Sequence, residues 1–495
     1  MKNILTFFQR ARRLFASKTF FYLVVAVFFF SSLWIALSAR YPMAFDENYH
    51  YKIIQQYSHQ YSPFFTHPPA ASEALGDITR YPSYLYHYLL SFVYRGLSLF
   101  NQSDQFRVIA LRFLNISFFA LGLYFYRKIL LQVGTGRATA HVVLFFFTLI
   151  PNVVFLAGQI NYDNLLVLAT SVTVLLCIRY LQSLKAGQID LRTFFLLAIV
   201  NLFSSLIVFT HLPVFFATEL LIVLATVRFY QKHTSSFNIK LVKSWRTITP
   251  FVRSTLLIFV LLGLGLFLER YGYNQLRYGR LTPTCAQVLS EKRCLAYGPA
   301  VRDQKLMQKP PLQWSTGRDF LQWAGQNMYE LFFTINYNYT NKPPLPIPFY
   351  ASWILTIAGF ASLLWNWKKW AKNPAAIWLG FIVLVYVVSL WINNLNSFHR
   401  VGFPVAIHGR YFVHLLPFIL LSILTGIKYV LLRLPRATSQ KLIAVFPLLL
   451  VLVFTQGGGI TSFILASNNE WYWERSFSIE YNQRFQSALK HLIIK

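Results

Sequence analysis

Two adjacent carboxylates, Asp46 and Glu47, follow directly on the first long apolar segment of the chain. The chain has only 16 acidic residues among 495, so an acidic pair at the edge of an apolar segment is a candidate for chemistry. A carboxylate in such a place can act as a general base, and two carboxylates together can hold a divalent cation. We therefore interpret this pair as the centre of a membrane enzyme, with His50 one helical turn later on the same face.

A second aspartate, Asp163, stands where another apolar segment begins, directly after Asn161 and Tyr162. Each aspartate could instead be a helix N-cap, because Asp and Asn are preferred at that position. Asp46 can cap a helix that runs to about Gln60. For both aspartates, a capping role and a chemical role remain open. Two such sites on one membrane face could converge on a single ligand.

The elements that must position these residues are membrane helices. Hydrophobic residues make up 56% of the chain and charged residues 13%, against about 25% charged residues in an ordinary soluble domain. Apolar runs of roughly 18 or more residues mark spanning helices, so we expect an all-α polytopic membrane protein with about eleven of them. The expected spans lie near 19–39, 108–126, 139–157, 164–183, 191–209, 212–228, 252–269, 349–367, 375–391, 411–432 and 442–466.

The positions of Lys and Arg predict the orientation, since short cytoplasmic loops collect them. The basic tail 1–18 is placed inside, and the acidic pair then faces outside. This pattern holds only if the stretch 84–100 does not span but lies at the outer interface as an aromatic-rich helix. The net charge of +30 follows largely from the inside loops, with the basic stretch 228–253 against anionic headgroups, and needs no nucleic acid.

The expected organisation has five parts. They are a basic cytoplasmic tail (1–18), a catalytic transmembrane core (19–270) with a first outer loop (40–107), a large outer loop (271–348), C-terminal transmembrane helices (349–466) and an outer C-terminal helix (467–495). Cys285 and Cys294 lie in the large outer loop, where a disulfide and two free thiols both stay open. Glu219 lies inside a span and is a functional candidate by default, although pairing with His211 or with a backbone group is the simpler account.

The order of these motifs resembles the C-type membrane glycosyltransferase (GT-C) superfamily, which includes the catalytic subunit of oligosaccharyltransferase, the protein O-mannosyltransferases and the aminoarabinose transferases. These enzymes have an acidic pair in a long first outer loop, an interfacial helix that opens with a Pro-aromatic phrase, and a second acidic site. Asp46-Glu47, Tyr81-Pro82-Ser83-Tyr84 and Asn161-Tyr162-Asp163-Asn164 stand in those places in that order. His408-Gly409-Arg410-Tyr411-Phe412 is similar to the start of a late span in bacterial members. The resemblance covers about the first 270 residues and the span near 411–432.

Carried over, the resemblance implies a polyprenyl-phosphate-linked sugar as donor and an envelope glycan, lipid or protein as acceptor. Asp46 would be the general base or a metal ligand, with Glu47 and Asp163 orienting the acceptor. Asp46 and Asp163 could hold Mg²⁺ or Mn²⁺, although related branches work with and without a metal. Arg410 would bind the leaving phosphate through its planar guanidinium, unless it is an interfacial anchor. The expected substrate-binding residues are His50, Asn161, Tyr162, His399, Arg400, His408, Arg410 and Tyr411.

The sequence also departs from these relatives and leaves other classes open. The Trp-Trp-Asp acceptor signature of oligosaccharyltransferases is missing, so asparagine glycosylation is not expected. A flippase or other transporter of lipid-linked sugars is the main alternative, although transporters commonly show repeated halves and the two halves here do not match. A non-catalytic partner in envelope assembly is the other alternative. The resemblance alone suggests the bacterial plasma (inner) membrane, with the active site facing outside.

Overall fold

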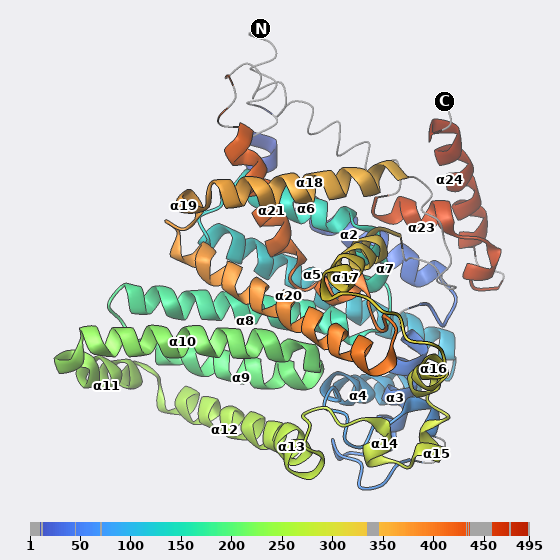
Figure 1. Ribbon diagram of the computed structural model, residues 1–495, viewed down its shortest axis with the longest axis horizontal. Coiled ribbons are helices and arrows are strands. Elements are labelled where there is room, and N and C mark those ends of the chain that lie inside the picture. The colour runs from blue at the N-terminus through green and yellow to red at the C-terminus, as the bar shows by residue number, and fades with distance from the viewer. Residues whose placement is uncertain are drawn as a thin grey trace.

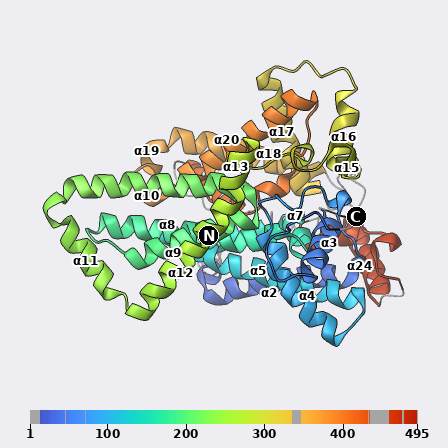
Figure 2. The same ribbon diagram turned by 90° about the horizontal axis from the view of Figure 1, so that it is seen from below.

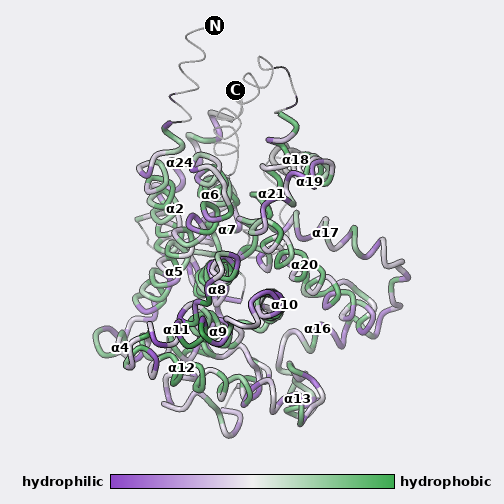
Figure 3. The backbone as a smooth tube through the Cα atoms, turned by 90° about the vertical axis from the view of Figure 1, so that its left-hand side faces the viewer, coloured by the Kyte–Doolittle hydropathy of each residue, from purple (hydrophilic) through white to green (hydrophobic). Residues whose placement is uncertain are grey.

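The computed structural model is all-helical in the part of the chain that it describes, which is residues 10, 13–44, 46–69, 72–333, 346–431, 433, 435, 458–474 and 477–493. The long helices run roughly side by side (Figure 1). Helices α3 and α4 lie at one end of this bundle and α11 lies at the other end (Figure 1). The apolar residues follow the long helices, whereas hydrophilic residues are frequent in α16 and in the segment that leads to α17 (Figure 3).

Six helical segments among the described residues are long and apolar enough to cross a membrane, which fits a membrane protein. They are α2 (Lys18–Ser38), α5 (Asp104–Gln132), α8 (Tyr162–Lys185), η2 with α10 (Phe209–Lys232), α12 to α13 (Pro250–Tyr278) and α20 (Pro374–Val401). The all-helical expectation is confirmed in this coarse form. The expected count of about eleven spans is not confirmed.

Three further expected spans correspond to shorter or broken helices. The span expected near 139–157 is broken into α6 (Arg137–Leu149) and α7 (Pro151–Ala157), which are bent by 74°. Proline restricts the residue before it to extended conformations, and Ile150 is extended, so the chain turns at Pro151. Helices α9 (Leu191–Ile207) and α21 (Leu416–Leu431) are apolar but only 17 and 16 residues long.

The span expected near 442–466 lies mostly outside the described residues, and the one expected near 349–367 corresponds to α18 (Pro346–Trp365). The stretch expected at the interface forms α4 (Leu85–Phe100), which is not among the six long apolar segments. The other helices used below are α3 (Glu47–Ser58), α11 (Phe237–Thr247), α14 (Cys285–Val288), α15 (Glu291–Cys294), α16 (Gly298–Met307), α17 (Thr316–Phe333), α19 (Trp367–Trp370), α23 (Ile460–Ala466), α24 (Ser478–Ile493) and η5 (Gly409–Phe412).

Helices α5 and α8 form the closest long pair in the centre of the bundle. Gly122 of α5 permits this approach, because a Cβ atom there would lie 2.7 Å from a side-chain methyl of Val167 in α8. Small residues at helix contacts allow such close packing in membrane proteins. Helix α8 is correspondingly the most buried of the six long segments.

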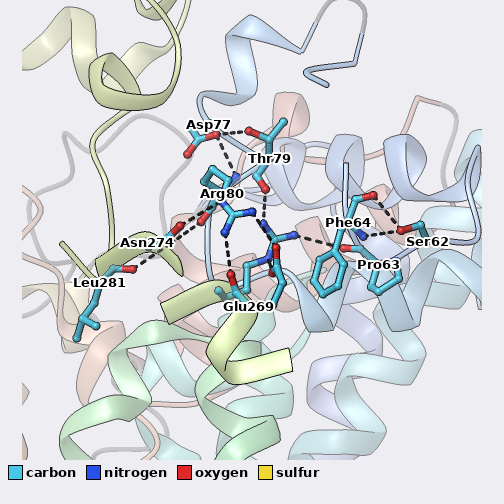
Figure 4. Close-up of polar contacts among 10 residues, drawn as sticks. Ser62, Pro63, Phe64, Asp77, Thr79, Arg80, Glu269, Asn274 and Leu281 are labelled. Carbon is cyan, nitrogen blue, oxygen red and sulfur yellow. Dashed lines mark hydrogen bonds and ion pairs between the residues drawn. The ribbon is translucent and has the colours of Figure 1, made fainter. Parts of the chain in front are cut away.

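The outer loop between α2 and α5 is fastened to the end of α12 by a polar network (Figure 4). Arg80 donates hydrogen bonds to Glu269 Oε1 at 2.8 Å and to Asn274 Oδ1 at 3.1 Å. Arg270 is fully buried, donates to the carbonyl of Thr79 and lies 3.2 Å from Glu269 Oε2. Glu269 thus pairs with both Arg270 and Arg80, and Arg80 extends the ion pair across to the loop between α2 and α5.

The segment that follows α13 covers the same loop. A disulfide joins Cys285 to Cys294, with the Cα atoms 5.9 Å apart. Arg293, next to this disulfide, forms an ion pair of 3.0 Å with Glu73 of the first outer loop. The segment then brings the ring of Tyr297 over Gly76 of that loop. The large outer loop therefore packs on the first outer loop and brings Tyr297 towards the acidic pair.

Candidate functional site

Asp46 holds a left-handed backbone conformation directly before α3, with φ 68° and ψ 23°. Asp46 occupies the N-cap position of α3, as the sequence allowed, but its side chain makes no capping hydrogen bond to that helix. The carboxylate instead accepts a hydrogen bond of 2.6 Å from Arg410 Nη2. A left-handed conformation is costly for most residues and more tolerable for Asp and Asn. The side chain is 52% exposed, so a ligand can reach it.

Asn161 is the N-cap of α8, because its side chain accepts the N–H of Asp163 at 2.9 Å. A neighbouring residue thus fills the capping role that was left open for Asp163. The Asp163 carboxylate is buried and its Oδ2 lies 3.9 Å from Arg410 Nε. One guanidinium therefore lies between two aspartates that come from the starts of α3 and α8.

Arg410 belongs to the short turn η5, between α20 and α21. Its backbone N–H donates to His408 Nδ1 at 3.1 Å, and His408 is the N-cap of this turn. Gly409 is required here, since a Cβ atom would lie 2.5 Å from the backbone carbonyl of Asn327 in α17. Helix α17 and the turn η5 consequently pack backbone to backbone, which fixes the position of the guanidinium.

His408 also contacts a carboxylate that the sequence analysis missed. Its Nε2 lies 3.2 Å from Glu330 Oε2 of α17. Burial, followed by the nearby charge of Arg410, lowers the pKa of His408 well below its ordinary value. His408 is therefore neutral at neutral pH, and its Nδ1 can accept the N–H of Arg410.

Five tyrosines, which we call the phenol group, surround the two aspartates and Arg410: Tyr49, Tyr81, Tyr162, Tyr297 and Tyr411. Burial, and next the charge of Asp46, raises the pKa of Tyr297 to about 12. Burial and the neighbouring phenols of Tyr297 and Tyr81 also raise the pKa of Tyr49. The ring of Tyr411 lies 5.3 Å from the guanidinium of Arg410. Protonated phenols can donate hydrogen bonds to an oxygen-rich ligand.

His50 forms a hydrogen bond with His87 of α4, with 2.9 Å between His50 Nδ1 and His87 Nε2 and the two rings nearly coplanar. The edge of Tyr162 meets the His50 ring at a centroid distance of 4.4 Å. Burial lowers the pKa of His87 to about 3, and burial with the neighbouring His87 and Arg410 lowers that of His50. Both imidazoles are therefore neutral at neutral pH, and both rings pack against Tyr162.

Glu47 points into the protein, away from Asp46, and is fully buried. Its two carboxylate oxygens accept from Arg112 Nε and Nη2 of α5 at 2.8 and 2.7 Å. They also accept the backbone N–H groups of Met43 and Ile160. With all of these hydrogen bonds Glu47 joins the ends of α2 and α5 to the segment before α8. It is placed to position Asp46 and Asp163 rather than to contact a ligand.

His399 and Arg400 are not brought to the site. Helix α20 continues through Val401, and both side chains are exposed on its last turn. Arg400 forms an ion pair of 3.1 Å with Asp303 of α16. The in-membrane Glu219 is likewise separate, since it accepts a hydrogen bond of 2.8 Å from Asn201, which stands between it and His211.

The divalent cation that was expected between Asp46 and Asp163 stays a prediction. The guanidinium of Arg410 lies beside both carboxylates, and its single positive charge offsets one of their two negative charges. No group of three His, Cys, Asp or Glu side chains within the described ranges is arranged to hold a metal ion. We therefore derive no step through a metal.

Four residues of this region were missed by sequence reasoning: Arg112, His87, Tyr297 and Glu330. Only Arg112 carried a signal, because a charged residue inside an apolar helix is a functional candidate by default. The other three lie on elements whose packing a sequence does not show. No protein-family model matches the chain, and no curated protein matches it. The geometry of Arg410 and its two aspartates is therefore the feature that bears most directly on function.

Proposed function

We propose that the chain is a membrane glycosyltransferase of the GT-C type. It would transfer a sugar from a polyprenyl-phosphate-linked donor to a glycan, lipid or protein acceptor at the outer face of a membrane. The observation that carries this proposal is the position of Arg410, 2.6 Å from Asp46 and 3.9 Å from Asp163 at one end of a bundle of apolar helices. Arg410 can stabilise the leaving phosphate, Asp46 is an accessible base, and the phenol group can donate hydrogen bonds to the sugar.

The reaction follows from the chemistry of these groups. The acceptor hydroxyl attacks the anomeric carbon and gives its proton to the Asp46 carboxylate, which acts as general base. The bond between the anomeric carbon and the phosphate oxygen breaks, and its electron pair remains on the phosphate. Arg410 stabilises this added negative charge, which develops at the edge of a low-dielectric region. A single displacement of this kind inverts the configuration at the anomeric carbon.

The same ion pair explains how donor binding would prepare the base. Without a ligand, Arg410 forms an ion pair with Asp46, and this contact occupies the Asp46 carboxylate. A donor phosphate offers more negative charge and a better bidentate fit to a guanidinium than a single aspartate oxygen does. Arg410 would turn to the phosphate, and Asp46 would become available to the acceptor. Asp163, buried beside Arg410, would keep the guanidinium oriented.

The transporter alternative has one observation in its favour. A polar cluster lies within the apolar helices α9 and α10, where Asn201 contacts both Thr218 and Glu219. Polar groups at such depth are a property of transport pathways. The cluster lies on helices other than those that carry Asp46 and Arg410, so the two functions can be tested by separate variants.

The test is transfer of radiolabelled sugar from polyprenyl-phosphate donors to envelope fractions by the purified protein in liposomes. Asp46→Asn should bind the donor and transfer about 10²- to 10⁴-fold more slowly, the range expected for loss of a general base. Arg400→Gln, an exposed cation at the end of α20, is the matched control. If neither the native protein nor the control transfers sugar, and donor crosses sealed vesicles in a manner that Glu219→Gln abolishes, the transporter is favoured.

A further inference from the structure

One face of α11 combines cations with exposed apolar side chains. Ile239 and Val242 on this face are 69% and 46% exposed. Lys243 and Arg246 are exposed beside them. The same face borders a shallow, open hollow lined by Asn238, Ile239, Val242, Lys243, Arg246 and Thr247.

Residues on the opposite face of α11 hold the helix against its neighbours. Phe237 packs on Tyr230 of α10, with ring centroids 5.1 Å apart. Trp245 packs on Phe195 of α9 at 6.0 Å. Ser244 accepts the backbone N–H of Leu191 at 3.0 Å, where α9 begins. Helix α11 is thereby held on α9 and α10, and the mixed face is directed away from them.

The charged residues around this face are all basic. The stretch from Arg228 to Arg253 contains six Lys and Arg residues and no Asp or Glu. Lys240 lies over the ring of Phe229 and Arg253 over the ring of Trp245, at 5.1 and 4.5 Å. Lys243 and Arg246, one turn apart, form no ion pair within the described part of the chain. No described residue supplies an anion for this pair, so the two cations are available to an anionic ligand.

The location of α11 indicates the source of such a ligand. The helix links α10 to α12 at the end of the molecule remote from α3 and α4 (Figures 1 and 2). Both neighbours are among the segments long enough to cross a membrane, so α11 lies where lipid headgroups begin. Helix α12 is the least buried of these segments and packs chiefly on α9. Its other end is held by the network of Arg80 and Glu269 (Figure 4).

We propose that the mixed face of α11 binds an anionic phospholipid. Lys243 and Arg246 meet the headgroup phosphate, and the apolar chains of Ile239 and Val242 lie along the upper part of an acyl chain. A soluble anion would gain nothing from the two exposed apolar residues, and a neutral lipid would gain little from two cations. Amphipathic helices with basic residues beside an apolar strip bind at anionic membrane surfaces in this way. The bound lipid would anchor the end of α12 that lies opposite Glu269.

The experiment measures phospholipid binding to the purified full-length protein by native mass spectrometry, with phosphatidylglycerol and phosphatidylcholine as probes. The test variant is Lys243→Gln with Arg246→Gln. The matched control is Lys368→Gln with Lys369→Gln, which removes the same charge from α19. We expect the test pair to weaken phosphatidylglycerol binding about thirty-fold, because each basic residue near an anionic surface contributes a factor of about five. The control pair should leave it within about two-fold.

Two further measurements decide between lipid and soluble anion. Ile239→Ser with Val242→Ser should also weaken phosphatidylglycerol binding, and inorganic phosphate in excess should not displace the lipid. Hydrogen exchange of residues 237–247 in nanodiscs should be slower with phosphatidylglycerol than with phosphatidylcholine. Equal binding of the two lipids, an equal loss in both charge variants, displacement by phosphate, or no effect of the apolar pair would each overturn the proposal. Sugar transfer is not a readout, so the result is independent of the proposed reaction.

Discussion

Arg410 Nη2 lies 2.6 Å from Asp46 Oδ2, although 364 positions separate the two residues in the chain. The contact joins the start of α3 to η5, and Asp163 at the start of α8 lies beside the same guanidinium. Three elements from distant parts of the sequence thus place one cation between two carboxylates. The charge and the accessibility of Asp46 in this arrangement are the basis of the proposed transfer.

Replacing Arg410 with Gln should remove the group that meets the leaving phosphate. We expect kcat/KM for sugar transfer to fall about 10²- to 10³-fold, the range seen when one donor to a developing anion is removed. Arg410→Lys should recover only part of this loss, because an ammonium lacks the planar fork. Steady-state kinetics with Arg400→Gln as the control checks the prediction, and an equal effect of the two Gln variants would contradict it.

Replacing Glu47 with Gln should act on stability more than on chemistry. The change leaves Arg112 buried with its charge uncompensated, and breaking a buried ion pair in this way costs about 3–5 kcal/mol. We expect a clearly lower midpoint in thermal unfolding of the detergent-solubilised protein. Glu47→Gln combined with Arg112→Met should be more stable than Glu47→Gln alone, because no unpaired buried charge remains. A single variant as stable as the native protein would show that Glu47 does not hold the loop.

The buried pair of His50 and His87 predicts that stability falls in acid. Burial lowers the pKa of both imidazoles, that of His87 to about 3. Below an unfolded pKa of about 6.5 the unfolded chain binds protons that the folded protein excludes, so stability falls as pH decreases towards 3. For His87 the loss is about 1.4 kcal/mol per pH unit, or about 2 kcal/mol at pH 5.

Thermal unfolding between pH 5 and pH 8 checks this prediction. His87→Gln removes one of the two titrating groups and should make the pH dependence shallower, whereas His59→Gln, at an exposed position after α3, should leave it unchanged. Identical pH profiles for the native protein and His87→Gln would exclude this origin of the acid sensitivity.

The left-handed conformation of Asp46 predicts different stabilities for three variants. Asn and Gly tolerate this conformation, so Asp46→Asn and Asp46→Gly should unfold near the native temperature. Ala does not, and Asp46→Ala should be less stable than Asp46→Asn by roughly 1–2 kcal/mol. The unfolding midpoints decide the point, and an Ala variant as stable as the Asn variant would contradict the conformational argument.

Apolar runs were sufficient to predict an all-helical membrane protein, because long hydrophobic stretches have few other folds available. The breaks were harder to predict. Pro151 was visible in the sequence, yet a proline alone does not determine whether a span bends or ends. His399 and Arg400 lie beyond the span expected near 375–391, whereas α20 extends to Val401 and ends only where Gly402 takes a positive φ of 80°.

The site was predictable as a set of residue types and only partly as an arrangement. Asp46 and Glu47 are adjacent in sequence, but they point in opposite directions, one to Arg410 and the other to Arg112. A linear motif does not show such a division, because it depends on the left-handed turn at Asp46 and on which helices pack nearby. Likewise, by residue type either Asn161 or Asp163 could cap α8. The Asn161 side chain accepts the N–H of Asp163, and this hydrogen bond identifies Asn161 as the cap.

The measurement that tests the central claim most directly is sugar transfer by the purified protein and by its Asp46→Asn variant, with donor binding measured on the same samples. We predict that both forms fold and bind a polyprenyl-phosphate-linked sugar, that the native protein transfers it, and that the variant is slower by a factor of about 10² or more. Transfer by the variant at the native rate would remove Asp46 from the reaction and contradict the proposed role of the Asp46–Arg410 pair.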